Sequence, residues 1–131
     1  MQHWENTVQR VNNKRLLDAD MTLERLAGDE KVLRSVASTF MRTAPQLLAS
    51  ITAALAGRDM KRAFAQTQSL KGAVAAFEAP QVLNSVLNVE RHAINEDAAA
   101  AAEALPVAQA LVEGLLAEVA RFASGGFQAQ A

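Results

Sequence analysis

The chain contains no cysteine, and its charges are almost balanced, with 13 lysines and arginines against 14 aspartates and glutamates. The first absence excludes disulfides, thiolate metal sites and cysteine nucleophiles, and it suits a reducing compartment. The balance leaves no field of one sign that would favour nucleic acid or an anionic membrane. No apolar run approaches the roughly 18 residues of a membrane span, and the polar N-terminus lacks the apolar stretch of a signal peptide. We therefore expect a cytoplasmic domain without membrane insertion.

Strand-forming residues are also scarce, since tyrosine is absent and β-branched residues are thinly spread. What remains is rich in alanine and leucine, and half of the residues are hydrophobic. Apolar residues recur at spacings of three and four, as on one face of a helix. A length of 131 residues fits one domain with one core. The composition therefore predicts an all-α domain.

Proline, glycine and capping residues divide the chain into helices. Asp29 and Asp59 are placed to begin two of them, and Pro80 suits a first helical residue. Pro45 and Pro106 fall inside long helices and predict kinks. The expected helices span residues 3–12, 22–27, 30–56, 60–77, 80–94 and about 97–122. The simplest arrangement is an antiparallel up-and-down four-helix bundle with one or two short extra N-terminal helices, in a single domain over residues 1–123 with a flexible tail at 124–131.

The helix expected at 60–77 has two different faces on a helical wheel. The predicted core stripe is formed by Ala63, Thr67, Leu70, Val74 and Phe77. The opposite face is formed by Lys61, Phe64, Gln68, Lys71 and Ala75, with Gly72 at its edge. An outward phenylalanine is unusual, and a glycine inside a helix costs up to about 1 kcal/mol relative to alanine. This face is therefore predicted to contact a partner; the alternative is that Phe64 packs under the N-terminal helix and Gly72 has no role.

The run Gln68-Ser69-Leu70-Lys71-Gly72 resembles the His-x-Leu-Lys-Gly motif of histidine phosphotransfer (HPt) domains. Residues 26–30, Leu-Ala-Gly-Asp-Glu, are similar to the family's Leu-Gly-Gly-Asp-Glu. The segment from Phe40 to Leu48 resembles its Phe-x-x-x-x-Pro-x-x-Leu pattern, and Ala54-Leu55 with Asp59 resembles its Ala-Leu-x-x-x-Asp hairpin. Ala79 fits the Gly-Ala that closes the motif helix, although Glu78 replaces the glycine. The resemblance covers about residues 17–122 and implies the family's four-helix bundle.

Gln68 occupies the position of the family's phosphorylated histidine, and this departure removes the family's chemistry. The histidine needs a nitrogen with a free lone pair, whereas the lone pair of a glutamine amide is delocalised into the carbonyl. The resemblance implies that Lys71 steadies phosphoryl oxygens, that Gly72 permits close approach, and that Phe64 and Ala75 give apolar contact. Lys61 is a candidate rim charge. The implied partners are a response-regulator receiver domain or a histidine kinase.

No cofactor or metal site is expected. His92, which lacks a following Lys-Gly, is expected to be an ordinary helix-end histidine, and His3 is expected to have no specific role. Two distant histidines do not form a metal site.

Three hypotheses follow for the function. The first is a non-catalytic pseudo-HPt module that binds its partner without carrying phosphate. The second is an active phosphotransfer protein in which the histidine has been changed to Gln68 by engineering, which the native gene sequence would decide. The third is a structural or oligomerising helical domain that buries Phe64 and Trp4 against another copy or a neighbouring domain.

Overall fold

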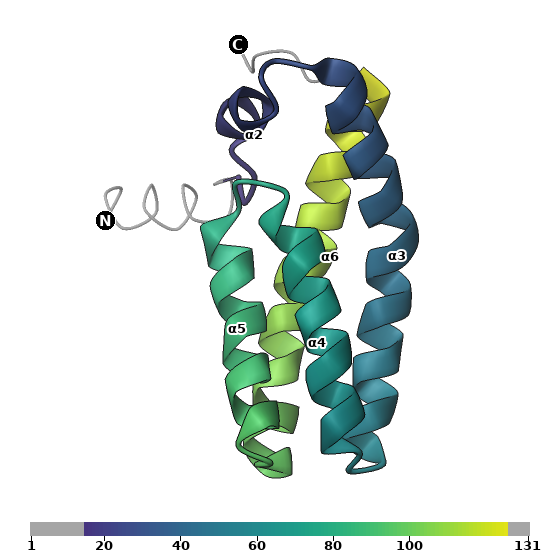
Figure 1. Cartoon of the computed structure of the whole chain (residues 1–131), viewed down its shortest axis with the longest axis vertical. Helices are drawn as coiled ribbons and strands as arrows, with labels where there is room; N and C mark the ends of the chain where they lie inside the picture. The colour runs from purple at the N-terminus through teal and green to yellow at the C-terminus, as the bar shows by residue number, and fades with distance from the viewer. Residues whose placement is uncertain (1–14, 126–131) are drawn as a thin grey trace, which may run out of the picture.

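A computed structural model of the protein describes residues 15–125 (Figure 1). Every regular element in this range is helical, which confirms the all-α class. The helices are α2 (Ala19–Arg25), α3 (Glu30–Ala56), α4 (Met60–Ala75), α5 (Pro80–Ile94) and α6 (Ala98–Gly125). The helix expected at 3–12 and the tail beyond residue 125 lie outside the described residues.

The four long helices run up and down beside one another, as the sequence predicts (Figure 1). Each long helix packs against the next in the chain, and α6 closes the ring against α3. The short α2 lies at the end of the bundle where α3 begins and α4 ends (Figure 1). Helix α4 is therefore held between α3 and α5 and keeps one outward face.

Local signals set the helix ends. The Asp29 side chain accepts hydrogen bonds from the first backbone N–H groups of α3, and Asp59 accepts one from Arg62 in α4. Pro80 is the first residue of α5. The bounds of three helices differ from expectation. Helix α2 spans Ala19–Arg25 instead of 22–27, because Asp18 caps it, and α4 ends at Ala75, two residues early. Helix α6 continues to Gly125, into the first residues of the expected tail. The long helices remain continuous through both internal prolines.

The core is a continuous apolar cluster between the four long helices. Phe40 of α3 packs on Phe77, just beyond α4, with ring centroids 5.0 Å apart and planes tilted by 59°. All five residues of the stripe predicted on α4 are buried: Ala63, Thr67, Leu70, Val74 and Phe77. Val32, an apolar residue near the start of α3, lies outside this core and is 41% exposed.

A buried carboxylate fixes the segment that precedes α2. Glu118 of α6 is only 8% exposed. Its oxygens accept hydrogen bonds from the Leu16 N–H at 2.8 and 3.0 Å and from the Leu17 N–H at 2.9 Å. These bonds satisfy both the buried charge and two backbone donors. The periodicity of α6 gives no hint of this role for Glu118.

Helix α6 bears on the expectation that no apolar run reaches the length of a membrane span. By length and composition alone, its Ala98–Ser124 stretch is apolar enough to cross a membrane. A single such helix is weak evidence, because a core helix of a helical bundle passes the same test. Its inward side supplies much of the bundle core: Ala101, Leu105, Ala108, Val112, Leu115, Val119 and Phe122.

Candidate functional site

The outward side of α4 presents the residues that the motif singles out. We call this surface the Gln68 face; its residues are Lys61, Phe64, Gln68, Lys71, Gly72 and Ala75. Lys61, Gln68 and Gly72 are exposed, whereas the other three are half-buried. The structure thus brings all six onto one side of one helix, and Lys61, Phe64 and Lys71 adjoin α5.

No neighbouring atom in the described part of the chain requires a glycine at position 72. It lies in the middle of α4, and a Cβ built on it would meet no atom within 4 Å. The backbone conformation is helical, so an alanine would fit there and would stabilise the helix. The bare backbone therefore has no explanation within the described residues, and it leaves open space beside Gln68.

Phe64 is neither a free surface residue nor a core residue. It is half-buried and packs against the edge of the core. It lines an open groove between the start of α4 and the end of α5, whose other residues are Arg58, Asp59, Met60, Lys61, Ala93, Ile94 and Glu96. Ile94, on the facing rim, is 59% exposed. This groove is at the opposite end of the bundle from α2, so α2 does not cover Phe64 (Figure 1).

Lys71 reaches sideways to α5. Its Nζ lies 2.9 Å from Oε2 of Glu90, and the exposed side-chain fractions are 34% for Lys71 and 14% for Glu90. The same oxygen of Glu90 is buried and has no hydrogen-bond partner in the described part of the chain, so the contact with Lys71 is ionic. Sequence reasoning missed Glu90, although its position on α5 beside α4 follows from an antiparallel pairing.

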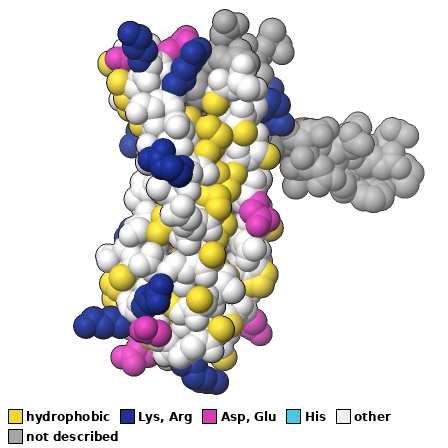
Figure 2. All heavy atoms as spheres, turned by 90° about the vertical axis from the view of Figure 1, so that its right-hand side faces the viewer, with side chains coloured by type: hydrophobic (Ala, Val, Ile, Leu, Met, Phe, Trp, Pro, Cys, Tyr) yellow, Lys and Arg dark blue, Asp and Glu magenta, His cyan; other side chains and the backbone are white. Residues whose placement is uncertain are grey.

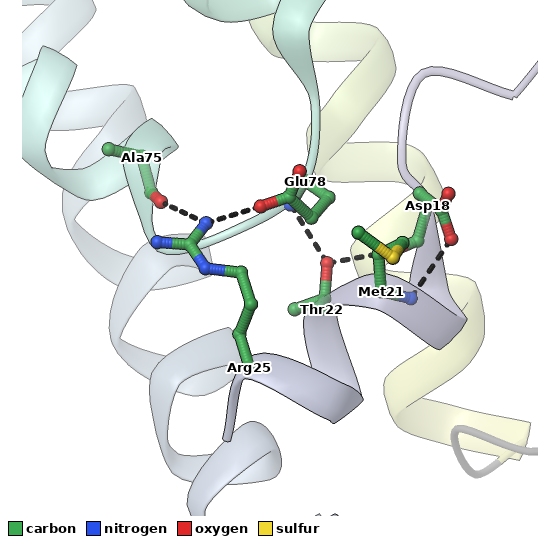
Figure 3. A network of polar contacts seen from close by, with 6 residues as sticks. All are labelled: Asp18, Met21, Thr22, Arg25, Ala75 and Glu78. Atoms are coloured by element: carbon green, nitrogen blue, oxygen red, sulfur yellow. Dashed lines mark hydrogen bonds and ion pairs between the residues drawn. The ribbon is translucent and has the colours of Figure 1, made fainter. Parts of the chain in front are cut away.

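The far end of the Gln68 face is joined to α2 by a polar network (Figure 3). Arg25 donates to the backbone carbonyl of Ala75 at 3.2 Å and pairs with Glu78 at 2.6 Å. The buried Thr22 hydroxyl accepts from the Glu78 N–H at 2.8 Å and donates to the Asp18 carbonyl at 2.8 Å. Glu78, which departs from the family's glycine, therefore helps to hold α2 in place.

A second surface lies on the other side of the bundle. Figure 2 shows hydrophobic side chains gathered in a band on the side where α3 faces the viewer. A groove between α3 and α6 is lined by Pro45, Leu48, Ala49, Thr52, Gln109, Glu113 and Leu116. It contains no residue of the motif.

Within residues 15–125, His92 is the histidine to be placed. His92 is half-buried in the last turn of α5, where its carbonyl accepts from the Asp97 N–H. His3 lies outside the described residues. Over residues 15–125, no group of histidine, aspartate and glutamate side chains is placed to hold a metal ion.

A four-helix bundle whose second long helix carries a Leu-Lys-Gly motif, with Lys71 and Gly72 on the outward side, defines a helical signalling domain of the phosphotransfer type. The Hpt domain family model matches residues 35–125, and the chain belongs to that family. Hpt domains are phosphotransfer carriers in phosphorelay signalling, and they interact with two-component kinases and receiver domains. Searches among curated proteins and among solved structures find no match.

Proposed function

We propose that this chain is a non-catalytic pseudo-HPt module of a two-component phosphorelay, with residues 1–123 as one domain. It binds a receiver domain, or a histidine kinase, through the Gln68 face and carries no phosphate. The observation that most supports this is Gln68 itself, exposed at the motif position on a helix that otherwise keeps Lys71 and Gly72.

The chemistry of the amide supports the loss of phosphotransfer. Acceptance of phosphate requires a nitrogen lone pair to attack phosphorus while the bond to the aspartyl oxygen breaks. The amide lone pair of Gln68 is delocalised, and no shift in its surroundings makes it a nucleophile. The amide still donates and accepts hydrogen bonds, so it suits the place of an imidazole in a docked complex.

The rest of the face supports docking. The absent side chain at Gly72 leaves room for a partner's backbone beside Gln68. The groove beside Phe64 and Ile94 supplies apolar surface that a partner can bury. Lys61 and Ala75 lie towards the two ends of the face and are proposed as flanking contacts.

The test is a titration of the full chain against receiver domains and histidine kinases from the same cell, with phosphate transfer assayed alongside. The expected result is saturable binding to one partner while radiolabelled phosphate stays on that partner. Phosphate appearing on the unmodified chain would contradict the proposal. Gln68→His should gain phosphate acceptance from a cognate phosphorylated receiver, because only the nucleophile is missing.

The band shown in Figure 2 favours one other function, an oligomerising helical domain. The α3–α6 groove exposes Pro45 and Ala49 beside Leu116. Measuring the mass in solution separates the two functions. The oligomerising domain would be supported by a concentration-dependent dimer that dissociates in Leu116→Glu, together with an absence of binding to receivers.

A further inference from the structure

We propose that Glu90 makes the Gln68 face select the unphosphorylated form of its receiver, by holding Lys71 in an ion pair. The inference rests on the receiver binding proposed above. It concerns which state of the partner is bound, and it assigns a specificity-determining role to a residue of α5 outside the motif.

The Lys71–Glu90 pair sets the charge that the Gln68 face presents to a partner. A free lysine three residues beyond Gln68 lies on the same side of the helix and would attract a phosphoryl group. Here the Lys71 ammonium already lies 2.9 Å from the Glu90 carboxylate. The pair has no net charge, whereas a phosphoryl group adds about −1.5 to −2 near neutral pH. The electrostatic attraction between Lys71 and a phosphoryl group is therefore largely cancelled by Glu90.

The pair also sets a cost for releasing Lys71. The Glu90 side chain is 14% exposed, and its Oε2 atom has no hydrogen-bond partner among the described residues. If Lys71 turned towards a phosphoryl group, this carboxylate would be left without a compensating charge. It would also repel the phosphoryl group across the α4–α5 seam. Both effects oppose binding of a phosphorylated receiver, and neither acts on an unphosphorylated one.

The alternative that Glu90 is only a structural partner of Lys71 makes a different prediction. A structural pair would affect both states of the receiver equally, through the position of α5 against α4. A state-dependent effect is what separates a specificity role from a structural one.

The experiment measures the affinity of the full chain for its receiver, unmodified and with beryllofluoride on the phosphoacceptor aspartate as the phosphoryl mimic. The chain without substitutions should bind the unmodified receiver at least as tightly as it binds the beryllofluoride form. Glu90→Gln, which keeps size and removes charge, should tighten binding of the beryllofluoride form by roughly fivefold and leave the other form unchanged. Glu113→Gln, exposed in the α3–α6 groove, is the matched control and should change neither.

A double variant shows whether Lys71 transmits the effect. Glu90→Gln combined with Lys71→Gln should lose the gain; if the gain persists, Lys71 is not involved and the proposal is overturned. An equal change for both receiver states in Glu90→Gln overturns it as well. Absence of binding to either state by every variant, with native helicity, is a different result that overturns receiver binding itself.

A measurement without any receiver tests the pair directly. Lys71 and the exposed Lys61 are labelled with a limiting amine-acylating reagent and compared by mass spectrometry. Lys71 should react several-fold more slowly than Lys61 in the unmodified chain, and Glu90→Gln should raise its rate severalfold relative to Lys61. An unchanged ratio would overturn the claim that Glu90 holds Lys71.

Discussion

The Glu118 carboxylate of α6 binds the backbone N–H of Leu17 at 2.9 Å and so fastens the segment before α2 to the last helix of the bundle. Glu118→Ala should lower the free energy of unfolding by about 2–3 kcal/mol, because it leaves the Leu16 and Leu17 donors unpaired. Urea denaturation measures this. Glu113→Ala, on the exposed side of the same helix, should stay within about 0.5 kcal/mol. Equal losses in both variants would mean that the Glu118 bonds do not contribute.

Gly72→Ala is expected to separate stability from docking. Since a Cβ at this position meets nothing within 4 Å, the variant should gain about 0.5–1 kcal/mol of stability from helix propensity. Receiver binding should weaken, because the added methyl group lies where the partner is proposed to approach. Thermal unfolding and the binding titration test the two effects separately.

Gly114→Ala is the matched control for that prediction. It lies inside α6, and its Cβ would lie 2.8 Å from Cδ1 of Leu16, so Leu16 has to shift. It should therefore gain less stability than Gly72→Ala and leave receiver binding unchanged. If Gly72→Ala and the unmodified chain bind the receiver with equal affinity, the proposal that a partner approaches closely at Gly72 is wrong.

Phe64→Ala should weaken receiver binding while the domain stays folded. Phe64 is half-buried at the edge of the core, so its loss should cost about 1–2 kcal/mol of stability. Phe40→Ala, at a position only 2% exposed, should cost about 3–5 kcal/mol. Circular dichroism and denaturation give the comparison. Global unfolding of Phe64→Ala would show that this residue is core.

In the polar network that holds α2, the buried Thr22 hydroxyl should contribute more to the free energy of unfolding than the ion pair of Arg25 with Glu78. Arg25 and Glu78 have side chains that are 51% and 30% exposed, so Glu78→Ala should cost less than about 1 kcal/mol. Thr22→Val keeps shape but leaves the Glu78 N–H without its acceptor, and should cost about 1–3 kcal/mol. Hydrogen exchange of the Glu78 amide should be faster in Thr22→Val and nearly unchanged in Arg25→Ala, which would show that the Thr22 hydroxyl protects this amide.

Most of the helices could be predicted from the sequence because their signals are local. Asp29, Asp59 and Pro80 mark helix starts through bonds or dihedral angles within a few residues. The buried stripe of α4 follows from the 3.6-residue period alone. The difference at α2 is local too, because the side chain of Asp18 caps the helix and starts it at Ala19.

The sequence by itself determined the bundle, the motif on α4 and the glutamine at position 68. Only the tertiary structure decided what surrounds that position: Lys71 is paired with Glu90, Phe64 is half-buried in a groove, and Ala75 lies under Arg25. The contacts that fasten α2 and its leading segment join residues 53 and 101 positions apart, such as Arg25 with Glu78 and Leu17 with Glu118. Helical periodicity fixes which side a residue faces, but the packing of other helices decides which charge or ring it meets there.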